Sequence, residues 1–164
     1  EKYSHPLLND SKKLSKKQRE QLREVILTDA VAWAVGEASP IEIDEINILN
    51  ATFLAMHRAV EGLKQHPEYL LIDGNRFKTT LSVPFSCIVK GDGKYLSIAA
   101  ASVLAKTHRD EYMCSLGEIS KLYGWEQNAG YPTKQHREAI AKYGTTPYHR
   151  QSFTLLAKQL DLFK

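Results

Sequence analysis

Several features that would point to a function are scarce or absent in this 164-residue chain. Its two cysteines, Cys87 and Cys114, form no CxxC pair, and no histidine stands at metal-ligand spacing from them. The sequence therefore gives no support to a disulfide framework or a zinc site. No apolar run approaches the ~18 residues that a membrane helix needs, and there is no internal repeat or linker. We expect a single cytoplasmic domain with reduced thiols and no membrane partner.

The formal net charge is +3, and the basic residues are unevenly distributed along the chain. A net charge of this size is common among proteins that bind no nucleic acid. Each basic cluster, taken alone, is also explained as a solvated face. Three clusters beside turn residues nevertheless favour a polyanionic partner. They comprise Lys12, Lys13, Lys16, Lys17 and Arg19; Lys90 and Lys94; and Lys134, Arg137, Lys142 and Arg150.

Hydrophobic periodicity and turn residues predict helices and strands that alternate along the chain. Two capping patterns mark helix starts, one at Ser15 with Gln18 and one at Ser39 with Glu42, where a proline takes the first helical position. We predict helices after Ser15 and at 46–63, 98–123, 134–143 and 153–162, and strands at 31–35, 69–72 and 83–89. Interleaved strands and helices indicate the α/β class. On the helix at 98–123 the expected inward positions are Ile98, Ala101, Ala105, Tyr112, Leu116 and Ile119.

Two aspartates follow adjacent predicted strands and are candidates for chemistry. Asp73 comes directly after a buried apolar run, and Asp92 lies in a glycine-rich turn after the next strand, between Lys90 and Lys94. Carboxylates at strand ends in α/β sheets commonly face the ligand crevice, and a buried carboxylate needs a partner or a cation. Two carboxylates with flanking lysines suit a Mg²⁺ site that handles a phosphodiester. The alternative at both positions is a tight Asp-Gly turn without a ligand.

The remaining acids and the histidines give weaker signals. Asp44, Glu45, Asp110 and Glu111 lie on helical patterns, where solvated faces or i,i+4 pairs explain them. The six histidines are scattered and match no nucleophile or metal signature. No phosphate-binding glycine loop or Ser-His-Asp arrangement is recognisable. The residues alone therefore leave the two strand-end aspartates as the best-supported site.

Six short motifs follow one another along nearly the whole chain. They are NDSKKLS at 9–15, EIDEINIL at 42–49, LIDGN at 71–75, KGD at 90–92 followed by SIAAASVLAK at 97–106, GYPT at 130–133, and HR at 149–150 with SF at 152–153. In content and order they resemble bacterial ribonuclease HII. The resemblance implies an α/β ribonuclease H-like fold, with a mixed central sheet flanked by helices. It also implies one domain at 1–164, in which residues 134–164 form a small helical C-terminal segment.

The same resemblance implies an activity and a set of site residues. The family uses four carboxylates to hold two divalent metals, Mg²⁺ or Mn²⁺, beside the scissile phosphate, and the last two map onto Asp73 and Asp92. It cuts RNA–DNA hybrids and single ribonucleotides in duplex DNA, which are the expected partners of an enzyme that we expect to be monomeric. Tyr131, in the GYP motif, is expected to stack near the sugar at the RNA–DNA junction. Further substrate contacts are expected from Lys12, Lys13, Asn75, Ser102 and Lys106.

The chain departs from the family at its N-terminal end. Family members open with a strand carrying DEAGRG, which supplies the first two metal ligands and the loop that senses the 2′-hydroxyl, the group that distinguishes RNA from DNA. No such motif occurs here, and the sequence begins at Glu1, shortly before residues 9–15. We expect that an N-terminal segment is missing and that residues 1–164 alone are catalytically inactive. Two other interpretations stay open, a non-catalytic nucleic-acid-binding fragment and a scaffold with turn aspartates and solvated lysines.

Overall fold

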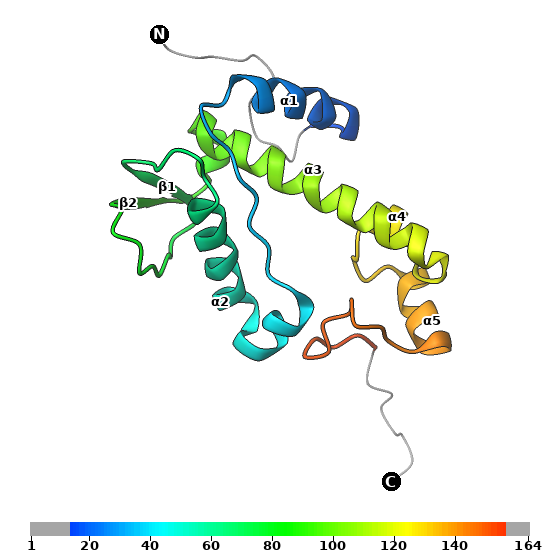
Figure 1. Cartoon of the computed structure of the whole chain (residues 1–164). Coiled ribbons are helices and arrows are strands. Elements are labelled where there is room, and N and C mark those ends of the chain that lie inside the picture. Colours follow the sequence, from blue (N-terminus) through cyan, green and yellow to red (C-terminus); the bar gives the residue numbers. More distant parts are fainter. Residues whose placement is uncertain (1–13, 157–164) are drawn as a thin grey trace. The chain divides into compact units, whose positions relative to one another are not determined.

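A computed structural model describes residues 14–156, and it confirms the predicted α/β class (Figure 1). The described residues form two compact units. Unit 1 contains residues 14–38 and 51–108, and unit 2 contains residues 39–50 and 109–156. The expected single domain with a C-terminal segment at 134–164 stays a prediction. In chain order the elements are α1 (Lys16–Asp29), α2 (Pro40–Glu61), β1 (Leu70–Asp73), β2 (Phe85–Ile88), the 3₁₀ helix η2 (Gly91–Gly93), α3 (Leu96–Ile119), the 3₁₀ helix η3 (Lys121–Tyr123), α4 (Trp125–Asn128) and α5 (Lys134–Tyr143).

The two predicted capping boxes are both formed. At α1 the Ser15 hydroxyl accepts a hydrogen bond from the Gln18 N–H, and the Gln18 side chain accepts one from the Ser15 N–H. At α2 the Ser39 hydroxyl and the Glu42 carboxylate make the same reciprocal pair, at 3.2 and 2.8 Å. Each box satisfies N–H groups that have no partner within the first helical turn. The sequence of four consecutive residues therefore predicted the start of each helix.

Helix α2 is interrupted near its start at Asn47. The backbone of Asn47 has φ 65° and ψ 165°, a conformation that residues other than glycine rarely adopt. Its side-chain oxygen accepts hydrogen bonds from the N–H groups of Leu49 and Asn50, at 3.0 and 3.2 Å. Asn47 therefore acts as an N-cap inside the helix, and α2 restarts in a new direction after it.

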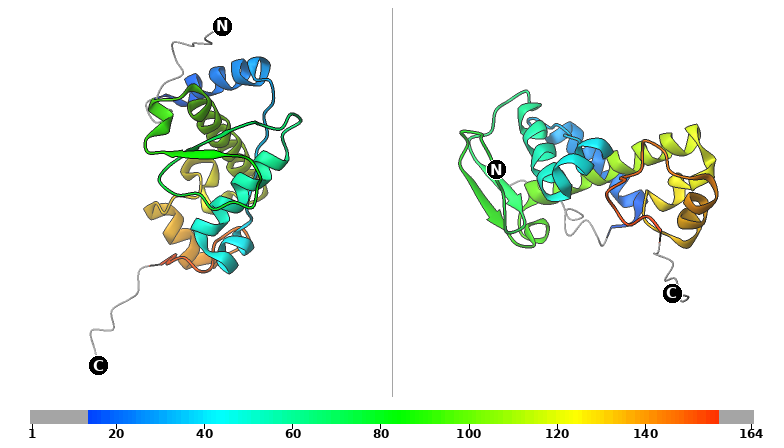
Figure 2. Two further views of the ribbon diagram at one scale, coloured as in Figure 1. Left: turned by 90° about the vertical axis from the view of Figure 1, so that its left-hand side faces the viewer. Right: turned by 90° about the horizontal axis from the view of Figure 1, so that it is seen from below.

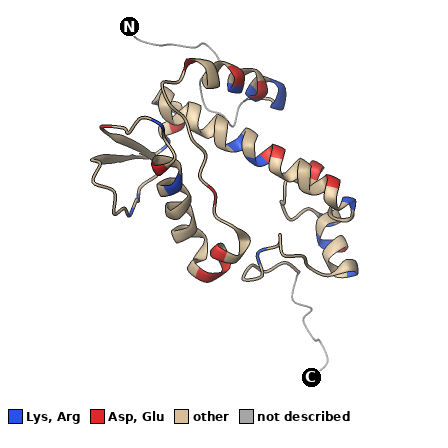
Figure 3. Ribbon diagram, viewed as in Figure 1, with Lys and Arg blue, Asp and Glu red and all other residues tan. Residues whose placement is uncertain are grey.

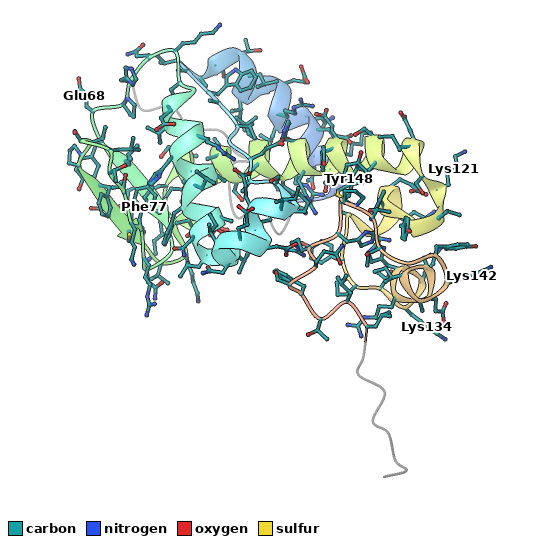
Figure 4. All side chains as sticks on the ribbon, turned by 60° about the horizontal axis from the view of Figure 1, so that its bottom comes forward. Glu68, Phe77, Lys121, Lys134, Lys142 and Tyr148 are labelled. Atoms are coloured by element: carbon teal, nitrogen blue, oxygen red, sulfur yellow. The ribbon has the colours of Figure 1, made fainter. Side chains whose placement is uncertain are left out.

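The sheet lies in unit 1 and is packed against the second part of α2. Strands β1 and β2 are parallel, with Leu70 opposite Phe85 and Asp73 opposite Ile88. Strand β2 falls inside the predicted range 83–89, and β1 extends one residue beyond the predicted range 69–72 to include Asp73. Figure 2 shows α2 beside the two strands, and Figure 4 labels Phe77 among the side chains between them. The buried core here is Phe53, Leu70, Ile72 and Phe77. A buried side chain of this kind contributes roughly 1.5–3 kcal/mol.

The prediction of a strand at 31–35 is wrong. Residues 32–39 have no helix or strand, and the segment packs on α2 instead of pairing with another strand. A Cβ at Gly36 would lie 2.0 Å from the Ala55 carbonyl oxygen, so only glycine allows this close approach. Val31 and Trp33 are 84% and 47% exposed. Small and large side chains do alternate in this segment, but the small ones pack against a helix. Alternation alone does not show whether a segment packs on a helix or pairs with a strand.

The inward face predicted for α3 is also wrong in part. Ile98 and Leu116 are buried as expected, but Tyr112 is 37% and Ile119 is 68% exposed, and the predicted alanines are not in the core. The helix contributes to two separate cores, one in each unit. In unit 1 it supplies Ala99, Val103 and Leu104, which pack on Leu22 and Ile26 of α1. One continuous inward stripe does not describe a helix whose two halves contribute to two separate cores.

Unit 2 has a mainly aromatic core. Tyr123 and Trp125 stack with ring centroids 4.9 Å apart, and α5 packs Ala139 and Ile140 against them. Helix α5 has the predicted bounds. The predicted helix at 153–162 is wrong for residues 153–156, which are not helical, and its remainder lies outside the described residues.

Two expectations from composition can also be compared with the structure. Cys87 and Cys114 are both free, as predicted, and both are half-buried. Within residues 14–156, no helix combines the length and apolar character needed to cross a membrane.

Candidate functional site

The strongest candidate site lies where β1 and β2 end, and we call it the Asp73–Asp92 corner. Because the strands are parallel, their carboxyl ends meet at the same edge of the sheet. Asp73 is the last residue of β1, and after β2 the chain turns through Lys90, which adopts a left-handed conformation, into η2. The N–H of Gly91 then donates a 2.8 Å hydrogen bond to Asp73 Oδ1. The structure thus brings the Asp73 carboxylate to the residue that immediately precedes Asp92.

Gly91 allows this corner to close. A Cβ at this position would lie 2.5 Å from Ile98 Cδ1, on α3, and 3.4 Å from Asp73 Oδ1. Ile98 is itself buried, so it has little room to move. The glycine in the KGD motif is therefore required by packing between the turn and the start of α3.

The two aspartates of the corner differ in exposure. Asp73 is exposed, whereas Asp92 is only 6% exposed. Carboxylate oxygens are the hard ligands that Mg²⁺ and Mn²⁺ prefer. Asp73 ends β1, and Asp92 lies in η2, shortly after the end of β2. They fit a divalent metal as two of its ligands. Among residues 14–156, no group of three or more His, Cys, Asp or Glu is placed to hold a metal ion.

The other predicted substrate contacts are distributed over both units. Asn75 is exposed in the loop two residues beyond Asp73. Ser102 and Lys106 are half-buried and lie one turn apart on α3, so they share a face of the helix. Tyr131 belongs to unit 2, separate from the corner. Lys12 and Lys13 lie outside the described residues.

Tyr131 is presented by a tightly bonded loop. Its ring is 65% exposed, so it is not part of the core of unit 2. The buried Asn128 fixes the loop, because its side chain donates to the Tyr123 carbonyl oxygen and accepts from the Gly130 N–H. The N–H groups of Tyr131 and Thr133 make two further bonds of 2.8 Å within the loop. An exposed aromatic ring on a rigid loop is suited to stacking against a sugar or a base.

The basic clusters are less available for binding than their sequence suggests. Lys94 donates to the Val89 carbonyl oxygen at 2.9 Å. Lys16 pairs with Glu20 and Lys134 with Glu138, one helical turn away in each case. Figure 3 shows charges of both signs along α1 and α3. Local pairs therefore account for part of each cluster.

Sequence reasoning missed the role of Asp44. One of its oxygens accepts from the N–H and hydroxyl of Ser152, at 2.9 and 2.5 Å, and the other accepts from the Gln151 N–H at 2.7 Å. We call Asp44, Gln151 and Ser152 the Asp44 clasp. The hydroxyl and N–H of Ser152, with the Gln151 N–H and the charge of Arg150, hold the pKa of Asp44 below its usual value. Asp44 lies at the surface, as expected of a solvated face, but it binds Gln151 and Ser152 and not a residue one helical turn away. The partners are more than 100 positions away, so no local pattern could have indicated them.

A buried histidine pair in unit 2 was also missed. The rings of His136 and His149 stack at 5.4 Å, and both side chains are buried. His149 Nδ1 accepts a hydrogen bond from the Thr146 N–H, while its Nε2 is buried without a hydrogen-bond partner. Burial first, and then the charge of His136, lower the pKa of His149. The pair is spaced 13 positions apart along the chain, which matches no short motif.

Comparison with known proteins agrees with the motifs. The sequence pattern of the family "Ribonuclease HII" matches residues 5–156. The chain is 65% identical over 162 residues to ribonuclease HII of Bacteroides fragilis, covering 98% of the chain and 81% of that protein. It is 62% identical over 161 residues to ribonuclease HII of Bacteroides thetaiotaomicron, covering 98% of the chain and 80% of that protein.

The fold agrees with that of a distant solved structure. The crystal structure of ribonuclease H2 from Pyrococcus horikoshii OT3 superposes with a TM-score of 0.69 at 24% identity, covering 89% of this chain and 76% of that one. At that identity the likeness supports the fold alone. The assignment of the chain to a family rests on the match to the family pattern and on the sequence identities given above. The chain belongs to the ribonuclease HII family of nucleases.

Proposed function

We propose that the intact protein is an endonuclease that cuts the RNA strand of RNA–DNA hybrids and single ribonucleotides in duplex DNA. The observation that carries the proposal is the Asp73–Asp92 corner, within a chain of the ribonuclease HII family. Two carboxylates at adjacent strand ends suit the hydrolysis of a phosphodiester with divalent metal ions. The expected partners are RNA–DNA hybrids and ribonucleotide-containing duplex DNA, and we expect the protein to act as a monomer.

In this proposal Asp73 and Asp92 hold Mg²⁺ or Mn²⁺. When bound, divalent ions activate a water molecule and stabilise the charge that develops on the leaving oxygen. The Gly91 N–H fixes the Asp73 carboxylate in one orientation through Oδ1, so the other oxygen points in a defined direction. A ligand that is already oriented loses less entropy when the ion binds.

The remaining site residues bind and orient the nucleic acid. Asn75, Ser102 and Lys106 belong to the same unit as the corner and would contact the backbone near the cut. Lys12 and Lys13 would add phosphate contacts. Tyr131 would stack on the sugar at the RNA–DNA junction, for which its 65% exposure leaves the ring accessible.

The test uses the intact protein and three matched duplexes. One carries a single ribonucleotide, one is an RNA–DNA hybrid and one is all DNA. We expect nicking of the first two with Mg²⁺ or Mn²⁺, no nicking of the third, and none of any duplex after chelation. Nicking of the all-DNA duplex at a similar rate, or nicking that survives chelation, would contradict the proposal.

A second candidate concerns residues 1–164 on their own. Because the described residues bring no third metal-ligating side chain to Asp73 and Asp92, we propose that this segment alone binds duplexes but does not cut them. The test is to purify residues 1–164 and measure both duplex binding and metal-dependent nicking. Nicking at the ribonucleotide by this segment would show that it contains a complete metal site.

A further inference from the structure

The loop that carries Tyr131 is held by hydrogen bonds on both sides of the tyrosine. Before it, Asn128 Oδ1 accepts from the Gly130 N–H at 2.8 Å, and the Asn128 carbonyl oxygen accepts from the Tyr131 N–H at 2.8 Å. After it, the Tyr131 carbonyl oxygen accepts from the Thr133 N–H at 2.8 Å, and the Thr133 hydroxyl caps α5 by accepting from the His136 N–H. The N–H and the C=O of Tyr131 are therefore both bonded.

Two buried side chains that support this loop meet at one backbone carbonyl, that of Tyr123. Asn128 Nδ2 donates to the Tyr123 oxygen at 2.7 Å, and His136 Nδ1 lies 3.0 Å from the same oxygen. Because a carbonyl oxygen can only accept, His136 Nδ1 carries the proton and donates. Asn128 is 9% and His136 is 5% exposed, and the His136 ring also stacks on His149. Both donors are thus enclosed in the core of unit 2.

The backbone of the loop takes a conformation that needs such support. Ala129 and Gly130 both have positive φ, 48° and 79°. A residue with a Cβ is disfavoured in this left-handed region, so the conformation of Ala129 persists where its surroundings hold it. A Cβ at Gly130 would lie 3.1 Å from Arg109 Nη2, so a side chain of α3 closes one side of the loop. The hydrogen bond from Gly130 to Asn128 therefore selects one conformation for the segment that leads into Tyr131.

We propose that Asn128 and His136 are positioning residues for Tyr131, which hold its exposed ring in one place relative to the RNA–DNA junction. The proposal rests on the proposed function for the role of Tyr131. Asn128 and His136 are buried, so they act through the loop and do not touch the nucleic acid. A ring that is already in place loses less entropy when it stacks on a sugar. Misplacement of such a contact lowers the rate of a reaction more than it lowers binding.

The experiment is a double-mutant cycle in the intact protein. Asn128→Ala, Tyr131→Ala and the double variant are compared with wild type for nicking of a duplex with one ribonucleotide. Binding of an all-DNA duplex is measured in chelator. The matched control is Leu116→Ala, which removes a side chain from the same core but leaves the hydrogen bonds of the loop intact. Thermal unfolding of each protein sets an assay temperature at which all of them are folded.

We expect Asn128→Ala to lower the kcat for nicking by about tenfold, with much less change in binding to the all-DNA duplex. In the Tyr131→Ala background the same substitution should have almost no further effect, because the ring that it positions is gone. Leu116→Ala should nick at the wild-type rate. A wild-type kcat in Asn128→Ala, an equal loss in Leu116→Ala, or losses that multiply in the double variant would each overturn the proposal.

A second variant covers the case in which Asn128→Ala does not fold. His136→Phe keeps a ring that can stack on His149 but lacks the donor to the Tyr123 oxygen. It takes the place of Asn128→Ala in the same cycle, and we expect a loss of kcat in the same direction that again disappears in the Tyr131→Ala background. A loss that persists in that background would overturn the proposal.

Amide hydrogen exchange separates this proposal from the proposed function, because it requires no nuclease activity. We expect the N–H groups of Gly130 and Tyr131 to be protected in wild type, and the protection of Gly130 to be lost in Asn128→Ala. A wild-type protein that shows this protection but never nicks would leave the bonded loop standing and remove the nuclease. A wild-type protein that nicks, but whose Gly130 N–H exchanges as fast as that of an unfolded chain, would leave the nuclease standing and remove the positioning role.

Discussion

Two aspartates, one in each unit, are held by hydrogen bonds from other parts of the chain, but in different numbers. Asp73 accepts one such bond, from Gly91, and is exposed. Asp44 accepts three, from Gln151 and Ser152. A carboxylate has about four acceptor sites. Asp44 therefore uses most of its acceptor sites to bind other parts of the chain, whereas Asp73 has acceptor sites left for a ligand.

The same contrast runs through the motifs that contain them. Three polar residues of EIDEINIL stabilise the fold. Glu42 completes a helix cap, Asp44 forms the clasp, and Asn47 caps the second part of α2. The LIDGN and KGD motifs instead bring an exposed carboxylate to a packed glycine turn. Motifs that match the family equally well thus have different roles. The number of hydrogen bonds that each aspartate accepts distinguishes a structural role from a ligand-binding one. The predictions below test that distinction.

The largest expected effect follows from removing the charge of Asp73. In the intact protein, Asp73→Asn keeps the oxygen that accepts from Gly91 but loses the negative charge that a metal ion needs. We expect nicking at a ribonucleotide to fall by orders of magnitude, while the melting temperature in chelator stays the same or rises. Glu68→Gln, an exposed acid just before β1, is the matched control. Near-normal nicking by Asp73→Asn would show that the corner is structural, like the clasp.

A smaller effect is expected at Tyr131. Tyr131→Ala removes an exposed ring from a loop whose bonds are made by other groups, so the fold should persist. We expect nicking at a single ribonucleotide to weaken by about tenfold, with much less loss in binding to plain duplex DNA. Tyr131→Phe, which keeps the ring, should retain most activity. Equal losses on both substrates would assign the ring a structural role.

The corner depends on Gly91 for its packing. Gly91→Ala would set a methyl group 2.5 Å from Ile98 Cδ1, and overpacking of this kind costs about 1–3 kcal/mol of stability. Ile98→Val removes that Cδ1 atom, so the double variant should recover part of the loss. Gly93→Ala, which would meet nothing within 4 Å, is the control. Denaturant unfolding measures the stability of wild type and of the four variants, and additive losses in the double variant would contradict the packing argument.

The sequence predicts local features of this fold better than distant ones. The two capping boxes and the end of the buried apolar run at Asp73 depend on residues within a few positions of each other, and all three were predicted. The segment at 31–35 was misread because it packs on the next helix, α2, and alternation of side chains does not distinguish such packing from strand pairing. The buried face of α3 was misread because two cores share that helix. Asp44 was missed because its partners are contributed by the opposite end of the chain.

The Asp44 clasp is expected to contribute to stability. Asp44→Asn keeps one acceptor oxygen but replaces the other with an amino group that meets an N–H donor, so the variant should melt at a lower temperature than wild type. Glu45→Gln, its exposed neighbour, is the control. Because the pKa of Asp44 is lowered below 3.8 in the folded protein, its charge stabilises the fold above that pH and the benefit is lost as pH falls through the folded pKa. A difference between variant and wild type that persists unchanged in strong acid would contradict this account.

The smallest expected effect is a second pH dependence, at the histidine pair. The pKa of His149 is lowered from 6.5 by burial and by His136, so the folded protein keeps it neutral while the unfolded chain takes up a proton. Its contribution to stability is complete above about pH 6.5 and falls as pH drops from there toward the folded pKa. The geometry supports this sign, because Nδ1 accepts from the Thr146 N–H and a proton on Nδ1 would oppose that donor.

The measurement compares wild type with His149→Asn, whose side-chain oxygen can still accept from Thr146. Unfolding free energies are taken from about pH 8 to about pH 5, and the difference between the two proteins is plotted against pH. Subtracting the variant cancels the titration of groups that both proteins share. We expect wild type to lose more stability than the variant below about pH 6.5, and to do so well before the acid range in which the Asp44 clasp fails. A difference that stays flat across the range would mean that His149 is as readily protonated in the fold as in the unfolded chain, and that its burial carries no electrostatic cost.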